Sequence, residues 1–152
     1  MNIWVDADAC PGAVKEILFR AADRRQIMVT LVANRMLRTP RSPWIRAVQV
    51  PQGFDVADNR IAELAQPGDL VITADIPLAS QALRCGAQVI DPRGDAYTAD
   101  NIEERLSVRS FMEEVRASGI QTGGPPPFSA ADGKAFADRL DRLLTRLLLR
   151  TI

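Results

Sequence analysis

Six aspartates stand where strands are predicted to end or a helix to begin, and they are the residues of this sequence best suited to chemistry. Carboxylates brought close together raise one another's pKa unless a cation neutralises them. Oxygen ligands without histidine or thiolate suit Mg²⁺ or Mn²⁺. Such an ion can activate water and stabilise charge on a phosphoryl group in transfer. The candidate metal ligands are Asp6, Asp8, Asp55, Asp58, Asp75 and Asp91.

The composition excludes most other catalytic chemistry. The 152 residues contain two cysteines and no histidine, so a Ser-His-Asp triad, a Cys-His pair and a histidine or four-cysteine zinc site cannot be built within this chain. The net charge is zero, with 19 basic and 19 acidic residues, so no overall field favours nucleic acid or membrane. We expect a cytoplasmic protein, because no signal peptide or apolar membrane span is evident and the two cysteines are scattered.

Short apolar runs alternate with helical patterns over the first 91 residues. We predict strands at 2–5, 27–33, 45–50, 70–74 and 87–90. Helices are predicted to open at Cys10-Pro11, with Pro11 in the first helical position, and to span 55–65 and 77–85. This alternation predicts an α/β fold: a mostly parallel sheet of four or five strands with helices on both faces. The link at 34–44 is predicted to be a loop, which is short for a parallel crossover.

Beyond Asp91 the pattern is helical, at 99–118 and 129–150, around a Gly/Pro-rich loop at 119–128. We therefore predict a single domain over 1–152, with an α/β core at 1–91 and a helical extension at 92–152. The last helix carries a leucine stripe that we expect to pack on the chain's own sheet, with a homodimer seam as the alternative. The stripe consists of Leu140, Leu143, Leu144, Leu147 and Leu148.

The predicted sheet would gather the acids at one edge. In an open parallel sheet, ligands bind beyond the carboxyl ends of the strands, where the strand order reverses. If the first strand is central and lies beside the fourth, Asp6, Asp8 and Asp75 meet at that point. Asp55 and Asp58, three apart on a helix, share a face that can look into the same crevice.

Each acid also has a purely structural interpretation. Asp55 is a plausible N-cap with Asp58 as its capping-box partner, and Asp91, before Pro92, is a plausible turn residue. The pair Asp6 and Asp8 is harder to explain in this way, because an Asp-x-Asp at the mouth of a buried strand is costly without a partner.

Two further residues near the acids, Cys10 and Thr73, also carry reactive or polar groups. Cys10 at a helix N-terminus would favour a thiolate, but free cysteines are usually buried small hydrophobes and no histidine can serve as base. Thr73 could bond a phosphate, or simply belong to its strand.

The stretch between residues 24 and 54 contains six arginines and no acid. Around Trp44 it resembles a phosphate-contacting loop with a stacking residue; the alternative is a solvated loop with Trp44 in the core. The candidate nucleic-acid ligands of this stretch are Arg35, Arg38, Arg41 and Arg46.

At these residues the sequence resembles a known family. The segment Asp6-Ala-Asp-Ala-Cys-Pro11 is similar to the opening signature of the bacterial YaiI/YqxD family, also called UPF0178 or DUF188. Further segments in family order cover nearly the whole chain, and the family is largely uncharacterised. These segments are Gly53-Phe-Asp-Val-Ala-Asp58 with Ile61, Gly68-Asp-Leu-Val-Ile-Thr-Ala-Asp75 with Leu78-Ala79, Arg93-Gly94, Tyr97-Thr98, Asn101-Ile102, Gly123-Gly124-Pro125, Phe128, Asp132 and Phe136.

More distantly, the family resembles the PIN-like superfamily of metal-dependent nucleases, which implies a three-layer PIN-like fold. The superfamily pattern implies catalytic roles for Asp6, Asp58 (or Asp55) and Asp75, the last within Thr73-Ala-Asp75. Asn101 joins Thr73 and the arginines as a candidate nucleic-acid ligand. One departure is that Ile76 and Pro77 stand where PIN nucleases often carry another acid; Asp8 or Asp91 would have to replace it.

Three functions follow as hypotheses. The first is a Mg²⁺- or Mn²⁺-dependent nuclease acting on RNA, in which activated water attacks a phosphodiester. The second is a non-catalytic RNA-binding or regulatory protein that keeps the acidic pocket. The third is a haloacid-dehalogenase-like phosphatase, which normally needs a lysine in the site, and only Lys15 and Lys134 are available.

Overall fold

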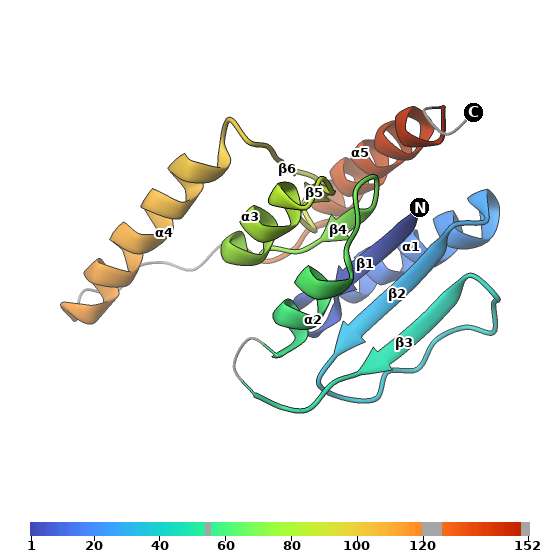
Figure 1. The fold of residues 1–152 in the computed structure, drawn as a ribbon, viewed down its shortest axis with the longest axis horizontal. Coiled ribbons are helices and arrows are strands. Elements are labelled where there is room, and N and C mark those ends of the chain that lie inside the picture. The colour runs from blue at the N-terminus through green and yellow to red at the C-terminus, as the bar shows by residue number, and fades with distance from the viewer. Residues whose placement is uncertain (54–55, 120–125, 150–152) are drawn as a thin grey trace.

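The computed structural model describes residues 1–53, 56–119 and 126–149, and these form a six-stranded sheet with helices on both faces (Figure 1). The strand order is β3-β2-β1-β4-β5-β6. The first five strands are parallel, and β6 pairs antiparallel with β5. The strands are β1 (Asn2–Asp6), β2 (Met28–Ala33), β3 (Ile45–Gln49), β4 (Leu70–Ile72), β5 (Gln88–Ile90) and β6 (Ala96–Tyr97).

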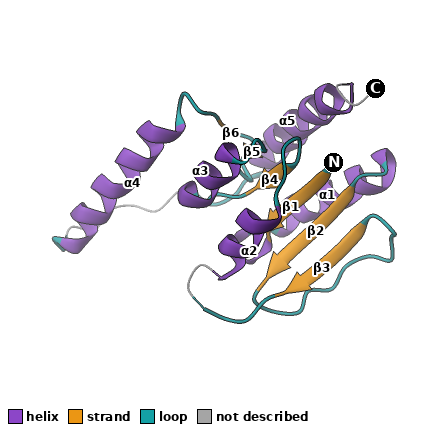
Figure 2. Cartoon of the chain, viewed as in Figure 1, coloured by secondary structure: helices purple, strands orange, loops and turns teal. Residues whose placement is uncertain are grey.

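The helices complete a three-layer arrangement, which Figure 2 shows against the strands. Alternate residues of each strand point to opposite faces, so Val5 and Leu31 lie in one core, with α1 and α5, while Trp4 and Val32 lie in the other, with α2 and α3. The helix α4 packs against α3 and stands apart from the sheet (Figure 1). The helices are α1 (Gly12–Arg25), α2 (Val56–Leu64), α3 (Ile76–Arg84), α4 (Ile102–Ala117) and α5 (Ala130–Leu149).

The predicted α/β class and mostly parallel sheet are confirmed, with three differences. A sixth strand, β6, was missed because two residues are too short to show an alternating pattern. Pro11 is the N-cap of α1 rather than its first helical residue. The helix α5 is more than an extension, because Phe136 and Leu140 belong to the same core as β1 and β2. That core is completed only when α5 packs beside α1.

The leucine stripe of α5 packs against the chain's own core, as expected. Leu140, Leu143, Leu144 and Leu147 are buried, and Leu148 packs against the same core. At the far end of α1, the Arg25 guanidinium pairs with the Asp141 carboxylate and donates to Thr145 at 3.0 Å. None of the helices in the described ranges is long and apolar enough to cross a membrane.

The strand order places a topological switch point at β1. From β1 the chain turns outward to β2 and β3 on one side, and it later returns to build β4 and β5 on the other. The carboxyl ends of β1 and β4 are therefore neighbours, paired in register from Ile3–Leu70 to Val5–Ile72. This is the edge at which an open parallel sheet binds its ligands.

Candidate functional site

Thr73 joins the two central acids of the sheet edge. Asp6 is the last residue of β1, and Asp75 follows β4 as the N-cap of α3. The Thr73 hydroxyl donates to Asp6 Oδ2 at 3.0 Å and accepts from the Asp75 N–H at 2.9 Å. Thr73 is 1% exposed, so its hydroxyl positions the two acids and is not open to a phosphate in solution. The convergence predicted for Asp6 and Asp75 is thus confirmed.

The carboxyl group of Asp6 has a raised pKa. The largest cause is burial, and the negative charges of Asp75 and Asp8 raise the pKa further, while the hydrogen bond from Thr73 lowers it. A raised pKa means that the folded state disfavours the charged carboxylate. A cation beside these acids would relieve that cost.

Replacing Asp6 by asparagine is expected to leave the metal-free protein at least as stable as the parent at neutral pH. Because the folded pKa lies above the ordinary 3.8, the cost of ionising Asp6 is absent below that pH, grows as the pH rises through the folded pKa, and is complete above it. Asparagine can still accept from Thr73, so the change removes the charge alone. Urea unfolding of parent and Asp6→Asn from pH 3 to 8 measures the difference.

The control for this experiment is Asp100→Asn, at an exposed position, which is expected to change neither the stability nor its pH dependence. A metal-free Asp6→Asn protein that is clearly less stable than the parent at neutral pH would contradict the electrostatic interpretation.

Asp8, Asp58 and Asp91 take different places around this pair. Asp8 lies in a short 3-10 helix (Ala7–Ala9) after β1, and its Oδ2 accepts from the Asn34 N–H at 2.9 Å. Asp58, in the first turn of α2, lines a hollow of about 250 Å³ together with Asp75.

Asp91 is a turn residue, because its Oδ1 accepts from the N–H groups of Arg93 and Asp95 at 2.8 and 3.0 Å. Burial raises the pKa of Asp91, and hydrogen bonds to Asp95 and Arg93 oppose that effect.

Carboxylate oxygens are the ligands that a hard cation such as Mg²⁺ prefers, and some oxygens of these acids take no hydrogen bond from the described residues. Asp6 and Asp8 each use one oxygen in a hydrogen bond, and Asp75 Oδ1 accepts from the Leu78 N–H at 2.9 Å. The other oxygen of each takes no hydrogen bond from the described part of the chain. Within 1–53, 56–119 and 126–149 no three acids or cysteines are grouped to hold a metal ion, and Asp55 lies outside these ranges. Mg²⁺ needs no such cage, since one or two carboxylates with water and substrate phosphates usually bind it.

Burial makes Cys10 a poor nucleophile. The residue is buried, its Sγ lies 3.7 Å from the Pro11 carbonyl oxygen, and the thiol pKa is raised to about 12, chiefly by burial. The thiolate is the reactive form of cysteine, and the raised pKa disfavours it. Cys10 therefore serves as a core residue. No lysine forms an ion pair with Asp6 or Asp8 in the described chain, which leaves the phosphatase hypothesis without its usual partner.

The four arginines predicted as nucleic-acid ligands do not gather at the acids. The loop 34–44 leaves β2 at the acid edge, which is the end of the sheet that carries Asp6 and Asp75. It runs alongside β3 to the opposite ends of the strands, where the Trp44 carbonyl accepts from the Val29 N–H at 2.7 Å (Figure 1). The four arginines of the loop and of β3, Arg35, Arg38, Arg41 and Arg46, are all exposed, and only Arg35 starts at the acid edge. Trp44 packs against the core, which favours its structural interpretation.

Asn101 has a structural role at the start of α4. Its Oδ1 accepts from the Thr98 N–H at 2.9 Å, and its Nδ2 donates to the Ala96 carbonyl at 3.0 Å. The side chain amide therefore closes the turn between β6 and α4.

Comparison with known proteins identifies the family. The family model described as "Uncharacterized BCR, YaiI/YqxD family" matches residues 4–146. The chain belongs to the YaiI/YqxD family. A UPF0178 protein of Burkholderia cenocepacia is 65% identical over 146 residues, which is 96% of this chain and 97% of that protein. A UPF0178 protein of Dechloromonas aromatica is 61% identical over 147 residues, 97% of this chain and 98% of its own. No solved structure matches the chain.

Sequence reasoning missed a charged pair of α4, Arg109 and Glu113, at the acid edge of this YaiI/YqxD protein. Arg109 of α4 lines the same hollow as Asp58 and Asp75, and pairs with Glu113 at 2.9 Å. Nothing in the local pattern of α4 marks Arg109, because only the packing of α4 on α3 brings it there.

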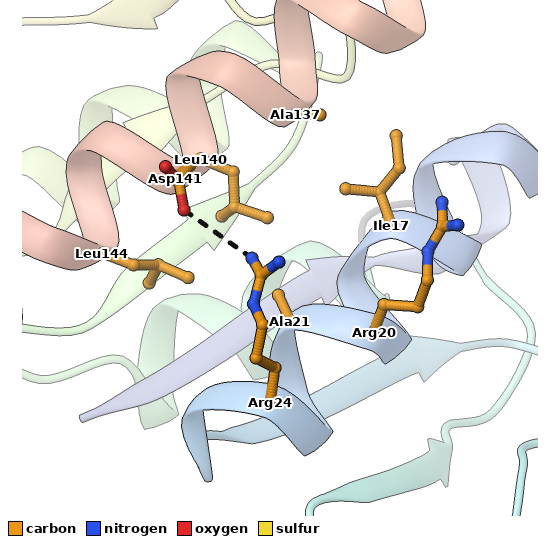
Figure 3. Close-up of a pocket in the computed structure, with 8 residues that line it drawn as sticks. All are labelled: Ile17, Arg20, Ala21, Arg24, Ala137, Leu140, Asp141 and Leu144. Carbon is orange, nitrogen blue, oxygen red and sulfur yellow. Dashed lines mark ion pairs between the residues drawn. The ribbon is translucent and has the colours of Figure 1, made fainter.

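A second hollow, of about 250 Å³, lies between α1 and α5 and takes no part in this site. Figure 3 shows Arg20 and Arg24 of α1 on one side and Leu140, Asp141 and Leu144 of α5 on the other, with Arg24 paired to Asp141 at 3.6 Å. Arg24 and Arg25 end α1, which is the end that leads into β2 and so lies opposite the acid edge.

Proposed function

We propose that this YaiI/YqxD protein is a Mg²⁺- or Mn²⁺-dependent nuclease that hydrolyses phosphodiesters in RNA. The observation that carries the proposal is the pair of acids Asp6 and Asp75, bridged by the buried Thr73 hydroxyl at the switch point of the sheet. The resemblance of the family to PIN-like nucleases, with an acid after the first strand and a Thr-x-Asp after a later one, agrees with this pair.

Asp6 and Asp75 would hold the ion, and Asp8 and Asp58 would border it. A bound Mg²⁺ or Mn²⁺ supplies Lewis acidity, which activates water and neutralises phosphoryl charge. The chain's own residues fix the geometry. The hydrogen bond from Thr73 orients the Asp6 carboxylate, and the N-cap contact with Leu78 orients that of Asp75. Rigid placement of this kind is what charge stabilisation in a transition state requires.

Thermal melts with Mn²⁺ test the metal site. The parent is expected to melt at a higher temperature in millimolar Mn²⁺, because a ligand that binds only the folded state stabilises it. Asp75→Asn should lose this shift. Asparagine caps a helix as well as aspartate does, so the metal-free variant should be as stable as the parent, or more so through relief of the repulsion with Asp6. Asp75→Ala, which loses the cap as well, should cost about 1 kcal/mol without metal.

Cleavage of a labelled single-stranded RNA in Mg²⁺ or Mn²⁺ tests the activity. Asp6→Asn and Asp75→Asn are expected to lower the rate by roughly a hundredfold or more, as the loss of metal support commonly does, while Asp100→Asn keeps it. Variants purified in the same way also control for contaminating nucleases. A parent with neither a Mn²⁺ shift nor Mn²⁺-dependent cleavage would refute the proposal.

A non-catalytic RNA-binding protein is the second candidate. Two observations favour it: the described residues contain no group of three metal ligands, and Ile76-Pro77 follows Asp75 directly. RNA binding without a Mn²⁺ shift and without cleavage would select this candidate.

A further inference from the structure

Among the described residues, the helix α4 packs chiefly against α3. Ile102 is its one buried residue among those described, and Val108 and Phe111 are 55% and 62% exposed. Figure 1 shows α4 beside α3 and clear of the sheet. A helix with so much exposed surface has either a solvated face or a binding face.

Three arginines align along α4. Arg105, Arg109 and Arg116 are four and seven residues apart, a spacing that places them in one row on a helix. With Val108 and Met112 of α4 and Ile76 of α3, they line a hollow of about 520 Å³, defined here as the arginine groove. Its lining therefore combines apolar side chains with three guanidinium groups.

Nearby acids balance part of the positive charge in the arginine groove, since Asp91 interacts electrostatically with Arg105. Arg105 lies over the Tyr97 ring, 5.0 Å from its centroid, which fixes its position. Neither Arg105 nor Arg116 forms an ion pair within the described residues, and Arg109 pairs with Glu113. Glu104 is the one acid that lines the groove, against three arginines.

The arginine groove adjoins the smaller hollow that contains Asp58 and Asp75. Arg109 lines both this groove and the smaller hollow that contains Asp58 and Asp75. A polyanion bound along the three arginines would thus lie next to the acid edge. The loop 34–44, by contrast, carries its arginines away from that edge.

We propose that the arginine groove binds a single-stranded segment of the RNA substrate, with phosphates on Arg105, Arg109 and Arg116 and bases against Val108, Met112 and Ile76. Guanidinium groups suit phosphate oxygens, and only unpaired bases can pack against apolar side chains of the lining. The inference rests on the proposed function for the identity of the polyanion. An acidic protein segment is the competing ligand, and the experiment includes it.

Two triple variants with the same loss of charge form the test. Binding of a short fluorescent oligouridylate is measured by anisotropy without metal, over a range of salt concentrations, for the parent, for Arg105→Ala/Arg109→Ala/Arg116→Ala and for Arg35→Ala/Arg38→Ala/Arg41→Ala. Each lost phosphate contact on a single strand flattens the salt dependence by about 0.7 units. The α4 variant should therefore lose about two units of slope and bind roughly tenfold more weakly or worse at low salt, while the loop variant stays near the parent.

Arg116→Ala alone guards against a folding defect, because Arg116 is exposed and has no ion pair in the described chain. It should lose about 0.7 units of slope with an unchanged melting temperature. The inference is overturned if the loop variant loses the slope and the α4 variant keeps it, if the parent does not bind the oligouridylate, or if a labelled polyglutamate binds as tightly. RNA binding through α4 without Mn²⁺-dependent cleavage would refute the nuclease and leave the groove standing. Cleavage that the α4 variant leaves unchanged would refute the groove alone.

Discussion

Asp69→Ala is expected to destabilise the folded protein by about 3 kcal/mol, because this buried carboxylate satisfies three donors at once. Asp69 is 4% exposed. Its Oδ1 accepts from the Asn2 N–H, and its Oδ2 accepts from Trp4 Nε1 and the Gln66 N–H, each at 3.0 Å. The residue thereby ties the start of β1 to the turn before β4, the two strands that carry the site.

Urea unfolding of parent and Asp69→Ala measures the loss, which corresponds to a fall in melting temperature of roughly 10 °C for a domain of this size. Asp69→Asn should also be destabilised, because the amide nitrogen cannot accept a hydrogen bond and one of the two oxygen positions is lost. Exposed Asp100→Ala serves as the matched control and should stay within about 0.5 kcal/mol of the parent. A cost below about 1 kcal/mol for Asp69→Ala would show that water replaces these contacts.

Gly94→Ala is expected to cost about 3 kcal/mol or more, because the residue both adopts a left-handed backbone and touches α5. Its φ is +93°, and an added Cβ would lie 2.8 Å from the carbonyl carbon and oxygen of Ala135. The Gly94 carbonyl also accepts from Arg139 Nε at 3.1 Å. A side chain here would push α5 away from the turn between β5 and β6.

Gly68→Ala separates the two contributions to this cost. Gly68 has a φ of +87° and nothing within 4 Å of an added Cβ, so its replacement reports backbone strain alone, about 1 kcal/mol. The difference between the two variants in urea unfolding measures the contact with α5. Equal losses would show that α5 moves aside freely.

The turn that contains Gly94 is held from several directions. The Arg93 guanidinium pairs with Asp132 at 2.7 Å and lies 5.8 Å from the centroid of the Phe128 ring. Hydrogen bonds from Ser129 and the charge of Arg93 lower the pKa of Asp132. These contacts fix the first turn of α5 against the sheet. They explain how a helix far along the chain completes the core that contains Val5 and Leu31.

Local sequence pattern is enough to predict the buried strands of this protein. Continuous apolar runs such as those around Val5 and Ile72 define buried parallel strands, because both faces of those strands are covered. The same runs place Asp6 and Asp75 at strand ends, and the parallel order then brings them to one edge. That much of the site needs no coordinates.

Which polar groups share that edge depends on how distant segments pack together. Asp91 directly follows β5, and its Oδ1 is used in the turn that comes next, since hydrogen bonds with the following residues are formed locally. Arg109 lies 34 positions beyond Asp75 and reaches its hollow only because α4 packs on α3. The loop arginines are dispersed because the strand that follows them is parallel, which forces the loop to run back along the whole sheet. Contacts between distant segments depend on how layers pack, and no periodicity in a single sequence encodes that packing.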